Sequence, residues 1–141
     1  MTSLNLSQAR QLLDGALTES RRAAFKPMGV VVVDAAAQVL ASVREDGASA
    51  LRLDIAQGKA AAAIGMGVNS RVLAQRTKEV PVFLGAIASA SDQKFIPQTG
   101  AVLIHNAEGQ VIGAIGASGG TGDEDEQIVI AGVVAAGLKH A

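Results

Sequence analysis

The sequence contains no cysteine, tryptophan or tyrosine among its 141 residues, and only three phenylalanines. Without cysteine the chain forms no disulfide, no thiolate metal site and no cysteine nucleophile. With so few aromatic rings it offers little surface on which single-stranded nucleic acid could stack its bases. The net charge of −1 also creates no basic surface that would attract a phosphate backbone. We therefore expect no nucleic-acid partner.

Long apolar runs are missing as well. The two longest nearly apolar segments, 60–68 and 128–138, are far shorter than the roughly 20 residues that span a bilayer. The segment 1–7 has neither the basic region nor the apolar core of a secretory signal peptide. These absences favour a cytoplasmic protein with no membrane partner. A chain of 141 residues is long enough for one core, so we expect a single domain over residues 1–141.

Hydrophobic periodicity predicts two hairpins, each followed by a helix, behind a leading helix. The predicted helices are 7–24 with Ser7 as its N-cap, 49–64, one that begins near 69 or 70, one that begins near 81, and 123–140. The predicted strands are 28–33, 39–44, the short pair 95–96, 100–105 and 110–117. Hairpins make a sheet mainly antiparallel. The sequence thus predicts an α+β domain whose five-stranded sheet is covered by helices.

The segment 109–126 joins a predicted strand to a helix through a glycine-rich bend. Glycines in such a bend are typical of phosphate-binding loops, but four consecutive acids at 123–126 bring negative charge to the helix N-terminus and would repel a phosphate. We therefore reject a nucleotide loop. The acids fit helix capping, a bound cation or a salt bridge between subunits, and we assign no metal site.

Several short motifs follow one another in a fixed order along nearly the whole chain. They are Val32-Val33-Asp34, residues 44–48 (Arg-Glu-Asp-Gly-Ala), Lys59-Ala60, and residues 111–120 followed by Asp125-Glu126. In this order they resemble the GlcG/HbpS family of haem-binding or "haem-degrading domain" proteins. The resemblance implies a profilin-like sandwich that assembles into homo-oligomers. The chain departs from the family pattern at Thr99-Gly100-Ala101, where members often have Pro-Gly-Gly, and at Ala37, where they often have glycine.

The resemblance also directs attention to charged and small residues that would surround a ligand. Arg44, Asp46 and Lys59 recur in the family pattern; a buried Lys59 would bind a carboxylate or move a proton, or it would form a structural ion pair. The expected pocket lies between the Gly100 loop, the bend at 118–120 and the helix that carries Lys59, near a subunit interface. The predicted ligand-binding residues are Arg44, Asp46, Lys59, Gly100, His105, Ser118, Gly119, Gly120, Asp125 and Glu126.

Haem iron would need an axial ligand, and the sequence offers few. His105 is either a solvated turn residue or a ligand, while His140 suits the end of a helix. The other candidates are Met28, Met66, an oxygen atom or a lysine. Ser118 has no base beside it in the sequence, so we name no catalytic residue.

Three functions remain open from the sequence. The favoured one is a small-molecule binding protein with haem or a related tetrapyrrole as its ligand. The alternative is a small cofactor-free enzyme, an isomerase or lyase of a catabolic pathway; Lys59 or Arg44 would hold a carboxylate and Asp125 or Glu126 would transfer a proton. The third is a structural or regulatory oligomer. In each case we expect a homo-oligomer, because the segment 128–138 is apolar on more than one helical face.

Overall fold

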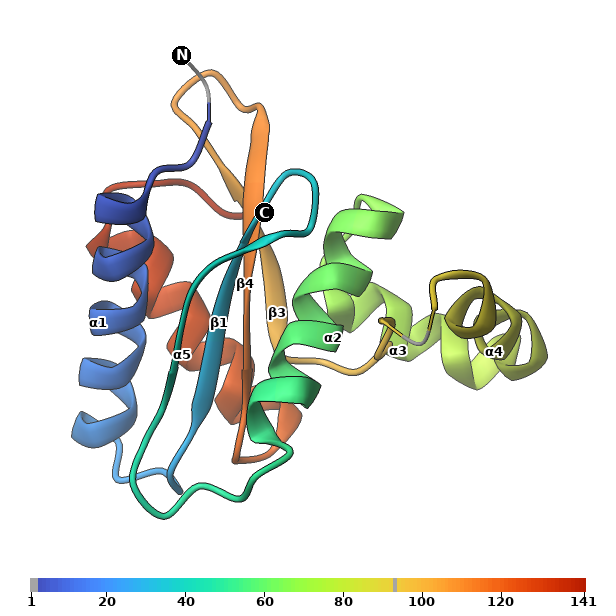
Figure 1. The fold of residues 1–141 in the computed structure, drawn as a ribbon, viewed down its shortest axis with the longest axis horizontal. Coiled ribbons are helices and arrows are strands. Elements are labelled where there is room, and N and C mark those ends of the chain that lie inside the picture. Colours follow the sequence, from blue (N-terminus) through green and yellow to red (C-terminus); the bar gives the residue numbers. More distant parts are fainter. Residues whose placement is uncertain (1–2, 93) are drawn as a thin grey trace.

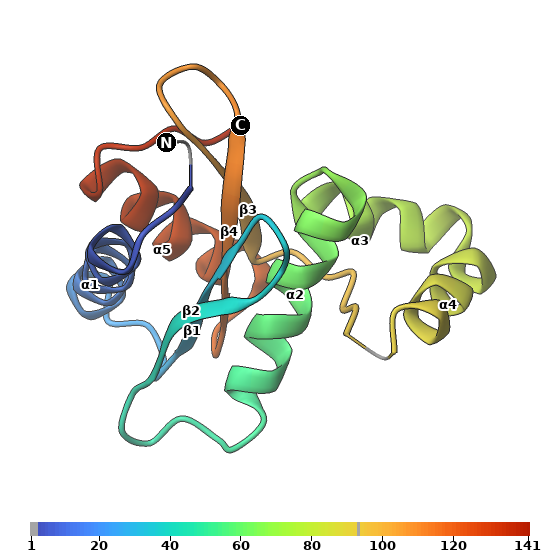
Figure 2. The same ribbon diagram turned by 45° about the horizontal axis from the view of Figure 1, so that its top comes forward.

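The structure is a computed structural model that describes residues 3–92 and 94–141. Its elements are α1 (Leu6–Arg22), β1 (Gly29–Asp34), β2 (Val39–Arg44), α2 (Arg52–Met66), α3 (Ser70–Glu79), α4 (Pro81–Ala90), β3 (Ala101–His105), β4 (Val111–Ser118) and α5 (Gly122–Ala135). The strands form one antiparallel sheet in the order β2-β1-β4-β3. Helices α1 and α5 cover one face and α2 covers the other, while α3 and α4 extend outward beyond α2 (Figures 1 and 2). The predicted α+β class is confirmed.

The sheet has four strands, so the prediction of a fifth strand at 95–96 was wrong. Phe95 is buried in a small cluster with Leu73 and Leu84, which lie on α3 and α4. The backbone N–H of Ile96 donates to the carbonyl oxygen of Gly58 at 3.1 Å. The segment therefore runs along helix α2 rather than along a sheet edge, and its apolar side chains are buried without strand pairing.

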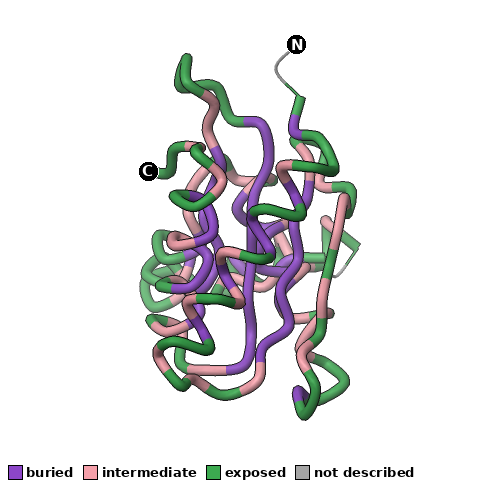
Figure 3. The backbone as a smooth tube through the Cα atoms, turned by 90° about the vertical axis from the view of Figure 1, so that its left-hand side faces the viewer, coloured by how far each residue is buried: buried purple, intermediate pink, exposed green. Residues whose placement is uncertain are grey.

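Strand β1 lies at the centre of the molecule, as its unbroken run of valines predicts. Val30 and Val32 belong to the core between the sheet and α1 and α5, whereas Val31 and Val33 belong to the core under α2. Buried backbone accordingly runs through the middle of the fold in Figure 3. Two apolar cores, one on each face of the sheet, fix the positions of the covering helices.

Two helix ends differ from the prediction. Asn5 caps α1 instead of Ser7, because its side chain accepts from the N–H of Gln8 while the Gln8 side chain accepts from the N–H of Asn5. Helix α5 ends at Ala135 rather than near His140. No helix in the described part of the chain is long and apolar enough to cross a membrane.

Helix α5 uses its several apolar faces within this chain. It packs on the sheet and also on α1, where a Cβ on Gly132 would lie 2.5 Å from the carbonyl oxygen of Leu12 and one on Gly15 would lie 2.7 Å from a side chain of α5. Much of the apolar pattern that suggested an oligomer therefore has an explanation inside one subunit. Exposed apolar surface remains at Val134 of α5, which is 63% exposed, and on α4, where Val82 is 87% exposed and Phe83 61% exposed.

Candidate functional site

Lys59 and Asp125 form a buried ion pair that joins the two faces of the sheet. Lys59 lies on α2 and Asp125 on α5, and Lys59 Nζ is 2.9 Å from Asp125 Oδ2. The same Nζ donates to the carbonyl oxygen of Ala117 at 3.0 Å. On the other side, the N–H of Gly120 donates to Asp125 Oδ1 at 3.0 Å. The side chains are only 6% and 2% exposed, so the pair is shielded from water.

Gly100 makes room for this pair. Its φ is +135°, and a Cβ there would lie 2.8 Å from Lys59 Nζ and 2.9 Å from Asp125 Cβ. Burial raises the pKa of Asp125, and the charge of Lys59 and the N–H of Gly120 oppose that rise. The space beside Gly100, where a ligand was expected, is thus filled by the protein's own side chains.

The acids at the start of α5 each have a protein partner. Glu124 Oε1 accepts from the N–H of Thr121 at 2.9 Å and completes a capping box. Arg71 of α3 bonds to Glu126 at 3.0 Å and also to Asp123, and these bonds raise the pKa of its guanidinium. Asp125 pairs with Lys59, so each of the four acids has a partner within the protein. Among the described residues no three His, Asp or Glu side chains are grouped to hold a metal ion.

The glycines of the bend serve close packing. A Cβ on Gly119 would lie 2.4 Å from the carbonyl oxygen of Pro27 and 2.8 Å from Met28 Sδ, and one on Gly120 would lie 2.6 Å from Glu124 Oε1. Met28 is fully buried beneath them. The bend therefore lacks side chains because the chain on either side leaves no room for them.

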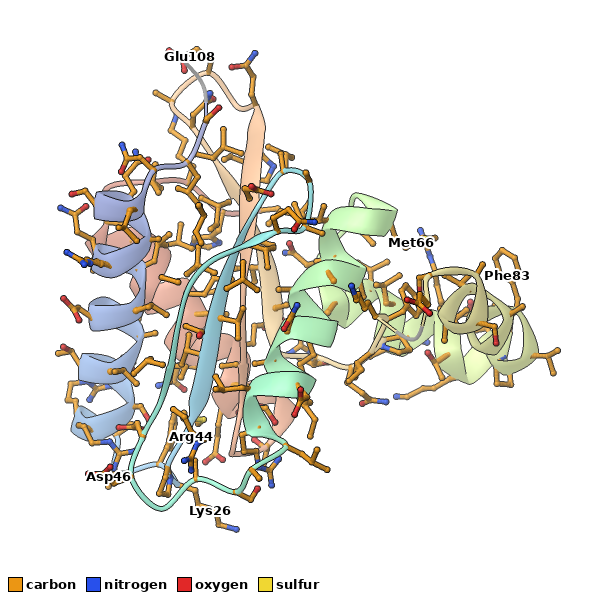
Figure 4. The ribbon with its side chains drawn as sticks, in the orientation of Figure 1. Lys26, Arg44, Asp46, Met66, Phe83 and Glu108 are labelled. Atoms are coloured by element: carbon orange, nitrogen blue, oxygen red, sulfur yellow. The ribbon has the colours of Figure 1, made fainter. Side chains whose placement is uncertain are left out.

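Arg44, Asp46 and Ser118 lie at the same end of the sheet as the ion pair. Arg44 and Ser118 are both paired with Gly29 of β1 in the strand register. Ser118 Oγ, which is buried, accepts from Arg52 Nη1 at 3.1 Å. Arg44 and Asp46 are exposed and line a hollow of about 420 Å³ (Figure 4).

His105 is separated from these residues. It lies at the end of β3, beside the β3–β4 turn, which Figure 4 marks with Glu108 at the opposite end of the molecule from Arg44. Its backbone N–H and carbonyl pair with the backbone of Lys139 at 2.8 and 3.0 Å. The structure thus divides the predicted site residues between two ends of the sheet.

The largest of the hollows described lies on α2. This α2 hollow, of about 530 Å³, is lined by residues 36–39 of the β1–β2 connection, by Gln57, Ala61 and Gly65 of α2, and by Ser91 and Lys94 after α4. Gln57, Ala61 and Gly65 are four residues apart and share one helical face, while the face that carries Ala60 packs on the sheet. A Cβ on Gly65 would meet no atom within 4 Å, so this wall is open.

Sequence reasoning did not assign Arg52, Arg71 or the α2 hollow to a site. The spacing of Gln57, Ala61 and Gly65 was visible in the sequence as a second face of α2. Arg52 and Arg71 gave no such signal, because their partners lie 66 and 55 residues away in the sequence.

The histidines and methionines of the described residues are poorly placed to bind haem iron in either hollow. No histidine or methionine of the described residues lines the α2 hollow or the hollow at Arg44 and Asp46. Met66 is half-buried and packs against the cluster formed by α2, α3 and α4 (Figure 4), and His140 is exposed with Nδ1 3.1 Å from the Ala141 carbonyl oxygen.

Comparison with known proteins finds a family model described as "Haem degrading protein HbpS-like", which matches residues 4–134. HbpS of Streptomyces reticuli, solved as a double mutant, is 27% identical; the match covers 95% of this chain and 87% of that chain, with a TM-score of 0.81. A complex of PduOC with haem is 23% identical over 97% of each chain, with a TM-score of 0.86. The ORFY protein of Klebsiella pneumoniae is 22% identical over 97% of this chain and 92% of that chain, with a TM-score of 0.81. No curated protein matches significantly.

Proposed function

The chain belongs to the HbpS-like haem degrading protein family, and on this premise we propose that it binds haem or a related tetrapyrrole. The family match over residues 4–134 is the observation that carries the proposal. The likeness to HbpS supports it, and the haem complex of PduOC shows that a chain of this fold accommodates the ligand.

The ligand site that we propose is the α2 hollow. Small-molecule sites are concave and combine apolar surface with polar groups that fix the orientation of the ligand. Ala61 and Gly65 leave room on α2 for a planar ring, and Val39 of β2 adds apolar surface to the same hollow. Gln57 supplies polar atoms, and the exposed Lys94 supplies a positive charge for a carboxylate.

Three of the four residues named for an enzyme bind other side chains. Lys59 and Asp125 form a buried pair, and Glu126 accepts from Arg71, which favours a binding protein over an enzyme that uses them. Arg44 lines the second hollow, and a ligand-binding role for it stays a prediction.

We also propose that the protein is a homo-oligomer that associates through α4. This helix buries only Leu84, while Val82 and Phe83 are exposed, and Figure 4 shows Phe83 on the side away from the sheet. Contiguous exposed apolar surface of this kind marks an interaction site. The same surface on a second copy of the chain can pack against it, because a two-fold interface joins identical patches. Because α4 ends immediately before Ser91, such an interface adjoins the α2 hollow.

A haemin titration with one variant and a matched control tests the site. Gly65→Leu fills the α2 hollow, where an added Cβ meets no atom within 4 Å, whereas Ala107→Leu places the same side chain on the exposed β3–β4 turn, outside both the hollow and α4. The unmodified protein should give a Soret band that saturates at one haem per subunit. Gly65→Leu should weaken binding at least tenfold, which corresponds to about 1.4 kcal/mol, while Ala107→Leu retains it.

Two results would count against the proposal. Equal binding by both variants would remove the α2 hollow as the site. Haemin uptake that never saturates in the unmodified protein would remove specific tetrapyrrole binding altogether.

A further inference from the structure

The usual axial ligands of haem iron in proteins are the side chains of histidine, methionine, cysteine and tyrosine. This chain has no cysteine or tyrosine. His105 is on β3, and the α2 hollow opens beside Val39 of β2; β2 and β3 are the two opposite edges of the sheet. Met66 follows Gly65 in the sequence but packs against the cluster that contains Ala62 and Leu73. None of these donors faces a ring in the α2 hollow.

The groups that do line the hollow suit other parts of a tetrapyrrole. The exposed side chain of Lys94 can donate hydrogen bonds to a carboxylate. Ser91 Oγ already donates to the carbonyl oxygen of Ala88 at 3.0 Å. Ala61 and Gly65 offer only van der Waals contact, which depends on the flat ring and not on the ion at its centre.

We propose that this protein recognises a tetrapyrrole by its ring faces and carboxylates and not by its iron, so that an iron-free porphyrin binds about as tightly as haemin. The inference rests on the proposed function and adds the ligand class to it: a planar tetrapyrrole dicarboxylate, with or without a metal ion.

The test compares three pigments on the full chain: haemin, iron-free protoporphyrin, and the protoporphyrin dimethyl ester, whose carboxylates are masked. Because the chain has no tryptophan or tyrosine, visible absorbance and porphyrin fluorescence report binding against an almost silent protein. Haemin and protoporphyrin should have dissociation constants within about threefold of one another. The dimethyl ester should bind at least tenfold more weakly.

Variants assign the two halves of the recognition. Lys94→Gln should weaken both diacids about tenfold and leave the ester unchanged, whereas Lys78→Gln on α3, outside the hollow, should alter none of the three. Met66→Leu and His105→Ala should leave the haemin Soret position unchanged.

Haemin binding more than tenfold tighter than protoporphyrin would overturn the inference and leave the proposed function standing. A Soret band that moves in His105→Ala or Met66→Leu would do the same and would identify the iron ligand. If no pigment binds saturably, the proposed function fails together with the inference.

Discussion

Replacing Lys59 by methionine tests whether the buried ion pair holds the two faces of the sheet together. Methionine keeps an unbranched side chain and a good helix propensity, so the variant removes little besides the charge. Asp125 then keeps the N–H of Gly120 as a hydrogen-bond partner but loses the ammonium 2.9 Å away. Removing one partner of a buried pair costs about 3–5 kcal/mol. At about 3 °C per kcal/mol for a chain of this size, Tm should fall by about 9–15 °C.

The loss should also depend on pH. In the Lys59→Met variant the positive charge that lowers the pKa of Asp125 is gone. Burial therefore raises this pKa further above its ordinary value of 3.8. The folded state then holds the proton more tightly than the unfolded state. The variant therefore loses stability as the pH rises from about 4 towards neutrality, and its deficit relative to the unmodified protein is larger near pH 7 than near pH 4.

Urea unfolding followed by far-ultraviolet circular dichroism is the suitable assay, because the chain has no tryptophan for fluorescence. Asp125→Asn is the reciprocal variant and should show a loss of similar size. The double variant of Lys59→Met and Asp125→Asn removes both charges and should recover more than half of that loss. A deficit below about 1 kcal/mol for Lys59→Met, typical of exposed pairs, would refute the reasoning.

The remaining predictions concern packing, association and surface charge. Gly100→Ala should cost about 2 kcal/mol more than Gly109→Ala, because both glycines have positive φ but only Gly100 lies against other atoms; equal losses in urea unfolding would contradict this. Phe83→Asp should shift sedimentation towards the monomer at micromolar concentration without changing the helical signal, and an unchanged mass would place the interface elsewhere. Arg71→Gln should cost about 1 kcal/mol or less, and a loss that persists in about 1 M salt would show that its bonds to α5 are not screened.

The parts of the fold that the sequence predicts well depend on neighbouring residues. The valine run of β1 and the turn between β3 and β4 are recognisable within a few residues, because burial and turn geometry leave a local pattern. The cap of α1 was also within reach. Asn5 and Ser7 are both good caps, but only Asn5 has a glutamine three residues later to complete the capping box.

The candidate site depends on contacts that leave no local pattern. The pairing of Lys59 with Asp125 joins residues 66 positions apart, so the sequence left both a ligand role and a structural ion pair open for Lys59. The prediction of a strand at 95–96 failed for a related reason. Two neighbouring apolar residues can pack against the face of a helix as well as in a sheet, so their presence does not distinguish the two. Gly58, which gives Ile96 its place on α2, is what distinguishes the two cases.

The outward position of α3 and α4 has a consequence for how the molecule opens. Their own small core, around Leu73, Leu84 and Phe95, is separate from the two cores of the sheet. Local unfolding of α4 exposes little that is not already in water, so its amides should exchange hydrogen far faster than those of β4. Ser91 and Lys94 lie just after α4, so one wall of the α2 hollow is attached to this outlying helix. A ligand that bridges this wall to α2 would then be detected as slower amide exchange in α4, at a distance from any atom that it touches.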